Sequence, residues 1–420
     1  MTTRARTRRF HGWRVVAAAF VLALFGLGAG FHGPAIYLHA VHQRTGWPLG
    51  LISTAVSAHF LLGALVVGHL PVLYARFGVP AVTKAGAFGL AVGVLGWATA
   101  AAPWQLFGAA LLSGTGWGAM SLAAVNAIVS PWFARARPAA LAMAYNGGGV
   151  GGILFPPLWA AAIPLLGFPV AAAAIGLVMT LVIWGLADRV FSQTPQGLGL
   201  APDGTPPEAT PPALQGTAAK PLPGSLLWRD RRFLTLAAGM SLGLFAQIGL
   251  VMHLFSLLVP ALGAQRAGLA MALVTTMAIA GRSFTGWLMP LGADRRLVAC
   301  LGYAVQIAGS LAFAAAAGTN VALLLLGVVL FGAGFGNGTW LPPLIAQAEF
   351  AEAEVPRVAA LVIAIAQAIY AFAPASFGLV RALGADAAGG DAAPGLFLAA
   401  ALVQGLAITT LLAGRRRRLP

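Results

Sequence analysis

The sequence contains little charge, few acidic residues and a single cysteine. Only 8% of its 420 residues are charged, and 10 Asp or Glu residues stand against 25 Lys or Arg. Soluble domains carry about 25% charge, and no soluble core could bury the 59% of residues that are hydrophobic here. Because Cys300 has no second cysteine to pair with, disulfide bonds within the chain, thiolate metal sites and redox pairs are excluded. Lipid must therefore be the solvent for most of this protein.

Apolar runs near the roughly 20 residues needed to cross a bilayer recur along the whole chain. They predict an all-α membrane protein with twelve transmembrane helices in two six-helix bundles. The first run is too long for the apolar region of a signal peptide, so we expect it to be retained. The predicted spans are 13–37, 49–74, 79–101, 104–133, 138–165 and 169–187, then 233–258, 268–291, 296–318, 321–346, 358–380 and 395–413.

The segment between the two sets of spans is rich in Pro and Gly and contains Thr-Pro-Pro twice. Such a composition cannot build a packed core. The sequence therefore predicts an N-terminal bundle in residues 1–187, a cytoplasmic linker in 188–232 and a C-terminal bundle in 233–420.

The Lys and Arg residues indicate how the chain is oriented. With the N-terminus inside, 21 of them flank the spans on the cytoplasmic side, and only Arg44, Arg266 and Arg381 lie outside. Positive flanks resist translocation, so both termini are expected in the cytoplasm of a bacterial cell. The chain is expected to be a monomer that crosses the inner membrane several times. The net charge of +15 sits in short clusters at helix ends. Binding to nucleic acid is therefore not expected.

The two halves show an internal repeat at an offset of 218 residues. It maps Gly63 onto Gly281, and Gly114-Thr-Gly-Trp-Gly118 onto Gly332-Ala-Gly-Phe-Gly336. It also maps prolines 138 and 156 onto prolines 356 and 374. Two halves of the same orientation are typical of a parallel repeat, which places the substrate site between them near the middle of the membrane. Many of these glycines also allow helices to pack closely.

Arg282 is the one basic residue that remains inside the predicted spans, and every acidic residue lies outside them. A buried guanidinium costs about 3 kcal/mol or more unless it meets a cavity or a counter-charge. We therefore expect Arg282 to face a water-filled cavity and to bind the carboxylate of a substrate through two parallel hydrogen bonds. The alternative is an arginine that caps helix carbonyls or reaches a pocket on the cytoplasmic side.

Three histidines fall within the spans and could carry a proton near neutral pH. The candidates for proton coupling are His59, which is the strongest because it is mid-helix, His32 and His253. The alternative for each is a hydrogen-bonded or interfacial histidine. No two of them have the i, i+4 spacing of a metal-binding pair, so neither a metal nor a cofactor is expected.

Other polar and aromatic side chains could complete a substrate cavity or could join helices by hydrogen bonds. Trp117 and Phe335, at equivalent places in the two halves, could form aromatic walls, although core packing is the alternative. The further candidates for substrate binding, besides Arg282, His32 and His59, are Asn126, Tyr145, Asn146, Gln247, Asn337, Gln367 and Tyr370.

At this point the motifs resemble a known family. The two-times-six layout with a long central loop resembles the major facilitator superfamily, and finer motifs resemble its monocarboxylate and oxalate/formate porter branch. Gly12-Trp13-Arg14-Val15-Val16 is similar to that branch's first helix, and the segment 132–144, Trp-Phe-Ala-Arg-Ala-Arg-Pro-Ala-Ala-Leu-Ala-Met-Ala, to its fourth loop and fifth helix. Gly281-Arg282-Ser283-Phe284 resembles the eighth helix. The resemblance implies that Arg282 binds the substrate carboxylate.

The chain also departs from this family. In the loop after the second span, Pro71 and Ala75 stand where the signature has Gly and Asp, and Pro290 stands at the corresponding Asp of the second half. Gating by that charge relay is therefore in doubt. Ala278 replaces the Asp that proton-linked monocarboxylate carriers place one turn before the arginine, and their first-helix lysine falls near Gly33.

These observations favour a secondary transporter for a small organic monocarboxylate. The oxalate exchanger has a second cation on helix eleven, where this chain has Ala366-Gln367, and one fixed cation suits a monoanion. Coupling by proton symport or by anion exchange stays open. The alternatives are efflux of a neutral or other small solute, and a membrane sensor or scaffold that transports nothing. An enzyme is not expected, because no nucleophile with a base and no metal site is apparent.

Overall fold

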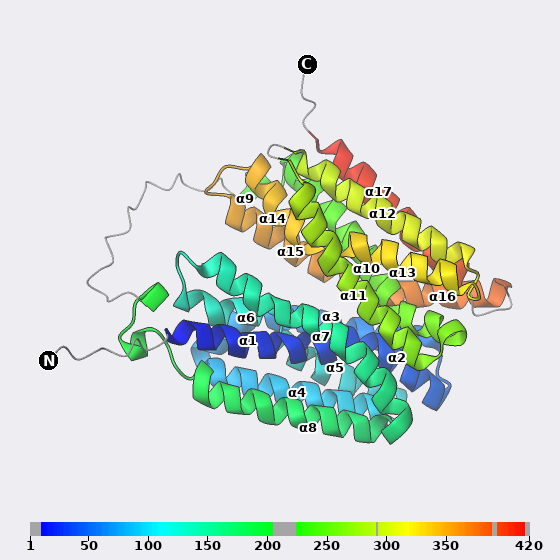
Figure 1. The fold of residues 1–420 in the computed structure, drawn as a ribbon, viewed down its shortest axis with the longest axis horizontal. Helices are drawn as coiled ribbons and strands as arrows, with labels where there is room; N and C mark the ends of the chain where they lie inside the picture. Colours follow the sequence, from blue (N-terminus) through cyan, green and yellow to red (C-terminus); the bar gives the residue numbers. More distant parts are fainter. Residues whose placement is uncertain (1–9, 205–223, 291–292, 389–392, 416–420) are drawn as a thin grey trace, which may run out of the picture.

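The structure is a computed structural model that describes residues 10–204, 224–290, 293–388 and 393–415. Within these ranges the chain is helical and contains no strand. Two bundles of helices lie side by side, one built from the first half of the chain and one from the second (Figure 1). Each bundle packs chiefly within itself, and a few helices form the contact between them.

The first bundle contains six long helical segments, some of them broken by short turns. Its elements are α1 (His11–Leu27), η1 (Gly28–His32), α2 (Gly33–Thr45), α3 (Leu49–Phe77), α4 (Val79–Thr99), α5 (Pro103–Ala119), α6 (Leu122–Val129), η2 (Ser130–Trp132), α7 (Arg137–Leu166), α8 (Phe168–Leu186) and η3 (Ala187–Phe191).

The linker contributes short turns and the second bundle the remaining long helices. These elements are η4 (Gln196–Leu198), η5 (Pro202–Gly204), α9 (Gly224–Leu227), α10 (Arg231–Leu262), α11 (Ala264–Leu288), α12 (Arg295–Ala315), α13 (Val321–Phe335), α14 (Asn337–Glu349), α15 (Val355–Tyr370), α16 (Ala373–Ala388) and α17 (Pro394–Ala413).

Eleven helices of the described chain are long and apolar enough to cross a membrane. The tenth predicted span, 321–346, is instead divided at Gly336 into α13 and α14, and α13 alone has 15 residues. Glycine and the prolines at 342 and 343 weaken a helix here, and hydropathy does not report such a break. The count of twelve crossings and the cytoplasmic position of both ends therefore stay predictions.

Two further spans are irregular near their middle. The first runs from His11 to Thr45 and contains η1, one turn of π-helix, between α1 and α2. The span Val355–Gly384 is interrupted by a turn at residues 371–372, between α15 and α16. Such turns free backbone carbonyl groups, which must then find other donors inside the membrane.

The glycines matched at the 218-residue offset make equivalent contacts in the two bundles. A Cβ atom on Gly63 would collide with Trp117 on α5, and one on Gly281 would lie 2.1 Å from the carbonyl oxygen of Ala333 on α13. In the same way α5 approaches α3 at Gly114, and α13 approaches α11 at Gly332. The repeat inferred from the sequence is thus a repeat of close helix contacts.

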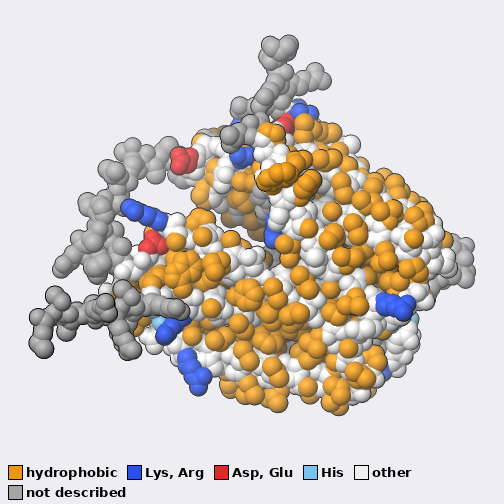
Figure 2. Space-filling view, viewed as in Figure 1, with side chains coloured by type: hydrophobic (Ala, Val, Ile, Leu, Met, Phe, Trp, Pro, Cys, Tyr) orange, Lys and Arg blue, Asp and Glu red, His pale blue; other side chains and the backbone are white. Residues whose placement is uncertain are grey.

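The bundles meet at one end and separate at the other. Contacts between them join α7 to α11, α3 to α16 and α2 to α10. Toward the end where α1 begins and α8 ends, the bundles diverge (Figure 1). Figure 2 shows a hollow between them, and a Lys or Arg side chain (blue) is visible inside it. We call the closed contact the seam and the hollow the cleft.

Candidate functional site

The position of Arg282 follows from how α11 packs on α7. These helices run antiparallel, because Gly268 faces Pro156 and Ala160, whereas Ile279, further along α11, faces Gly149. A Cβ on Gly149 would lie 3.0 Å from Ile279 Cδ1, so the Ile279 side chain packs on the backbone of α7 there. Arg282 follows Ile279 by three residues and therefore lies on the same helix face, one turn further toward the cleft. It stands where the two bundles begin to separate.

Arg282 is half-buried, and within the described ranges its guanidinium makes no hydrogen bond or ion pair. Ion pairs at helix ends join Lys84 to Asp188, Arg232 to Asp230, Arg296 to Glu349 and Arg415 to Asp294. Asp188 was expected just outside the sixth span but lies in the last turn of the continuous helix Phe168–Phe191. The five N–H donors of Arg282 are therefore available to a ligand.

His32 lies in η1 beside the seam. A Cβ on Gly152 of α7 would lie 2.5 Å from His32 Nε2 and 2.8 Å from Thr275 Cγ2 of α11, so His32 and Thr275 converge on this glycine. The His32 ring is half-buried, packs edge-on against Phe31, and forms no hydrogen bond with any residue that the structure describes. Thr275 precedes Arg282 by two helical turns, about 10 Å of rise. His32 therefore lies on the closed side of Arg282.

His59 is buried inside the first bundle, and both of its ring nitrogens are engaged. Nδ1 lies 2.9 Å from Ser113 Oγ and Nε2 lies 2.8 Å from the carbonyl oxygen of Gly30. Gly30 belongs to η1, and the hydroxyl of Tyr37 donates to the neighbouring carbonyl of Ala29 at 3.1 Å. His59 and Tyr37 thus provide donors for carbonyl groups at the π turn. This favours the structural alternative for His59.

His253 is also buried, and its neighbourhood corrects the expectation for Arg381. His253 Nε2 donates to the carbonyl of Pro374 at 3.1 Å. Arg381 was expected in an outside loop, but α16 continues past residue 380 and buries this side chain to 6% exposure, with its Nη1 2.6 Å from Ser256 Oγ on α10. No Pro or Gly follows Val380 directly, so the helix can continue. Arg282 is therefore not the only basic residue inside the helices.

An aromatic cluster lies between the π turn and the second bundle. Trp117 is buried, stacks on His59 with ring centroids 5.7 Å apart, and packs edge-on against Phe60 at 5.2 Å. Tyr370, at the end of α15, packs on Phe60 at 6.2 Å. Tyr370 thus contacts the first bundle across the seam, whereas Trp117 packs in the core of the first bundle. The half-buried Phe335 packs against Phe331 of its own helix.

The remaining polar candidates fall into two groups. Register with α11 brings Tyr145 and Asn146 of α7 to the level of Arg282, and Asn146 is exposed there. Gln367 is half-buried on α15. Asn126 is exposed on α6, a different helix from Tyr145 and Asn146, and accepts a hydrogen bond from Ser130 at 2.6 Å.

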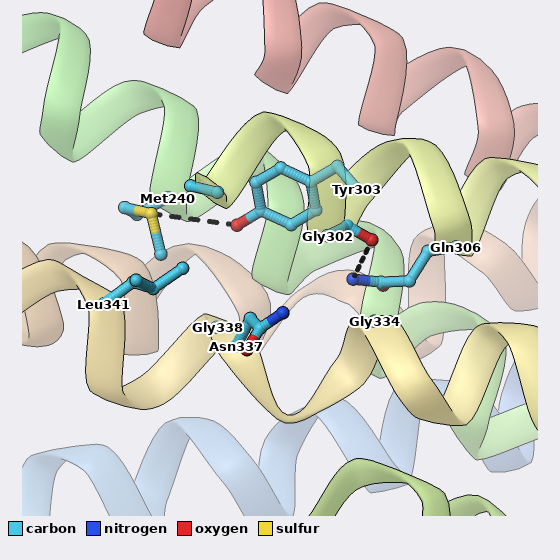
Figure 3. A pocket seen from close by; sticks show the side chains of 9 residues that line it. Met240, Gly302, Tyr303, Gln306, Gly334, Asn337, Gly338 and Leu341 are labelled. Carbon is cyan, nitrogen blue, oxygen red and sulfur yellow. Dashed lines mark hydrogen bonds between the residues drawn. The ribbon is translucent and has the colours of Figure 1, made fainter. Parts of the chain in front are cut away.

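Gln247 and Asn337 lie inside the second bundle. Gln247 is fully buried on α10 beside Gly338, and neither end of its amide has a partner among the described residues. Asn337 Nδ2 lies 3.4 Å from Thr285 Oγ1. Figure 3 shows Asn337 with Tyr303, Met240 and Gln306 around an enclosed space that has no room for a water molecule. These residues pack the bundle, and Asn337 also approaches α11 at Thr285.

Sequence reasoning did not identify Thr275, Ser57 or Arg381. Ser57 Oγ on α3 accepts a hydrogen bond from the Ala375 N–H of α16 at 2.9 Å, so it joins the two bundles as Thr275 does at the other interface. The offset of 218 residues maps Ser57 onto Thr275 and could have found both. In the described ranges no group of three His, Cys, Asp or Glu side chains could hold a metal ion.

Comparison with known proteins supports the fold. The family model for the Major Facilitator Superfamily matches residues 18–378. The crystal structure of the nucleoside transporter NupG is similar with a TM-score of 0.71 and 14% identity, covering 97% of this chain and 100% of that one. A bacterial homolog of the human lysosomal transporter Spinster, in an inward-facing and unoccupied conformation, is similar with a TM-score of 0.62 and 15% identity, covering 98% and 100%. No curated protein matches.

Proposed function

Because the chain belongs to the major facilitator superfamily of transporters, we propose that it carries a small organic monocarboxylate across the membrane by alternating access of the cleft to the two sides. Arg282 is the proposed carboxylate site. The observation that supports this most is a guanidinium at the inner edge of the cleft with no counter-charge from the described residues. The nucleoside and Spinster transporters share the fold at 14–15% identity, which does not carry a substrate over.

The charge of the proposed site suits one carboxylate. A guanidinium presents two parallel N–H groups to a carboxylate, and the low dielectric of the membrane strengthens such a pair. Arg381, on α16, is held by Ser256 and lies beyond the seam from Arg282. A second carboxylate next to Arg282 would have no cation of its own and would be poorly solvated. Tyr145 and Asn146 would bind the rest of the substrate.

The proposed cycle begins from the conformation seen here. With the linker in the cytoplasm, as the Lys and Arg distribution predicts, the cleft is open to the cytoplasm and the seam closes the outer side. Substrate bound at Arg282 removes the cost of the unpaired cation and permits the cleft to close. Anion exchange needs no titrating group. Proton symport would use His32, because its ring nitrogens are not engaged by described residues as those of His59 are.

Transport into proteoliposomes tests this proposal. Labelled formate, lactate and oxalate are offered with and without a pH gradient, and uridine is included because a similar structure is that of a nucleoside transporter. Arg282→Gln should lower uptake of the monocarboxylate at least about tenfold, since hydrogen bonds to charged groups contribute about 1.5–3 kcal/mol. Arg282→Lys keeps the charge but loses the fork geometry and should fall in between.

Arg266→Gln is the matched control, because Arg266 is an exposed arginine in the first turn of the same helix. It should transport as the unmodified protein does. Uptake of every carboxylate at the normal rate by Arg282→Gln would show that the site is wrong. Transport of uridine with no carboxylate transported would show that the substrate class is wrong.

A further inference from the structure

A second cavity lies outside the cleft, between α1 and the end of α8, with a volume of about 420 Å³. Its lining divides into two layers. His11, Arg14 and Arg189 line the end where α1 begins, and Ala17, Val21 and Leu186 lie deeper along the same helices. From residue 11 to residue 21 the helix rises about 15 Å, so the basic and apolar layers are separated along the membrane normal.

The cavity exists because α1 and α8 do not pack along their length. In the second bundle the equivalent helices, α10 and α17, are in close contact. At Gly239 a Cβ would lie 2.7 Å from Leu411 of α17, so glycine is required for that approach. The residue 218 positions earlier is Val21, whose side chain lines the cavity. The repeat therefore makes this gap a specific feature of the first bundle.

The basic layer has no anion from the described chain. Arg14 and Arg189 are exposed and make no hydrogen bond or ion pair there, and Asp188 is paired with Lys84 instead. Nε2 of His11 is buried without a partner among the same residues. Two guanidinium groups and an imidazole around one cavity are the donors that bind a phosphate group.

The apolar layer and its surroundings indicate a membrane-facing site. Leu177 and Leu181 of α8 are 60% and 63% exposed, which identifies the outer face of this helix as one covered by lipid. Trp13 and Trp184 are 42% and 41% exposed near the same end, as expected at the interface between lipid and water. A free phosphate ion would leave Ala17, Val21 and Leu186 without an apolar partner.

We propose that this cavity binds one anionic phospholipid, with its phosphate at Arg14 and Arg189 and its first acyl carbons against Val21 and Leu186. Basic pockets between transmembrane helices are suited to anionic headgroups for the same electrostatic reason. The bound lipid would fill the space that α17 fills in the second bundle and join α1 to α8. This proposal does not depend on the identity of the transported substrate.

Native mass spectrometry of the full chain in a neutral detergent tests the proposal. Phosphatidylglycerol and phosphatidylethanolamine with the same acyl chains are titrated separately, together with glycerol 3-phosphate as a headgroup without chains. We expect one phosphatidylglycerol to bind more tightly than phosphatidylethanolamine. Arg14→Gln with Arg189→Gln should lower that affinity at least about tenfold. Ala17→Phe, which fills the apolar layer and keeps both arginines, should also lower it.

Arg76→Gln with Arg231→Gln is the matched control, since both arginines are exposed at the same end of the molecule and neither lines the cavity. It should bind the lipid normally. Equal binding of phosphatidylglycerol by the Arg14, Arg189 double variant or by Ala17→Phe would overturn the proposal. Glycerol 3-phosphate binding as tightly as the lipid would also overturn it, because the occupant would then be a soluble phosphate.

Discussion

Gly378 gives the sharpest test of how the two bundles close. It lies on α16, and its backbone rests on Ser53 of α3 in the other bundle. One turn before it, Ala375 donates its N–H to Ser57. This part of the seam leaves no room for a side chain at residue 378, so Gly378→Ala should disfavour the closed seam and leave each bundle folded.

The expected size of the effect follows from the contact distance. An added Cβ would lie 2.6 Å from both Cβ and Oγ of Ser53, whereas carbon atoms in contact are about 3.5–4.0 Å apart. The bundles must therefore move apart by about 1 Å, and overpacking of this kind costs about 1–3 kcal/mol. Because the open form does not make this contact, the ratio of closed to open seam should fall about 5- to 150-fold.

Pulsed electron spin resonance measures that ratio directly. Spin labels on Gln43→Cys and Thr319→Cys, both exposed and on different bundles at the closed end, are introduced after Cys300→Ser removes the native thiol. Gly378→Ala should shift the label distances toward longer values. Gly384→Ala, on the same helix with open space around it, is the control and should not. Identical distances in all three proteins would refute the role of this contact in closure.

Two further predictions concern stability and the linker. Ser113→Ala leaves Trp97 Nε1 and His59 Nδ1 without a partner, so thermal unfolding in detergent should show that the free energy of unfolding falls by about 2 kcal/mol. Ser241→Ala, which removes a buried hydroxyl that has no partner among the described residues, is the control and should leave the free energy of unfolding unchanged. Equal losses in the two variants would contradict the prediction. The pKa of Asp203 lies below its usual value, because burial raises it but the N–H groups of residues 134–136 lower it more. The protection of these amides, measured against their intrinsic exchange rate at each pH, should therefore be full above about pH 4 and should fall as the pH falls through the lowered pKa. Unchanged protection in Asp203→Ala would contradict the contact.

Arg282 shows how much the positions of the charged residues in the sequence can predict. Because the predicted spans contained no carboxylate, its lack of a partner followed from the order of residues. The direction in which Arg282 faces did not follow from the sequence, because it depends on the contacts of Ile279 with Gly149 and of Gly281 with Ala333. Arg381 shows where the method fails. Hydropathy ended its span at residue 380, whereas α16 continues to Ala388, and only the fold shows that the Arg381 side chain contacts Ser256.

The three histidines also separate what the sequence predicts from what only the fold decides. All three fall within apolar runs, and only the mid-helix position of His59 ranked it first. His59 was expected to be the best proton carrier, but the π turn at residues 28–32 presents carbonyl groups to it and to Tyr37. A π turn leaves no periodic signal in so apolar a segment. His32 gained its position beside the seam from the same turn.

The sequence by itself determined that lipid surrounds this chain, that two similar halves pack through matched glycines, and that a cation without a counter-charge lies within them. These properties depend on composition and on spacing along the chain. Only the tertiary structure decided that Arg282 lies one turn beyond the contact of α11 with α7, that the ring nitrogens of His59 are engaged, and that a cavity remains at Val21 whereas the equivalent helices close at Gly239. These depend on the register between helices, which is set by contacts between residues far apart in the sequence.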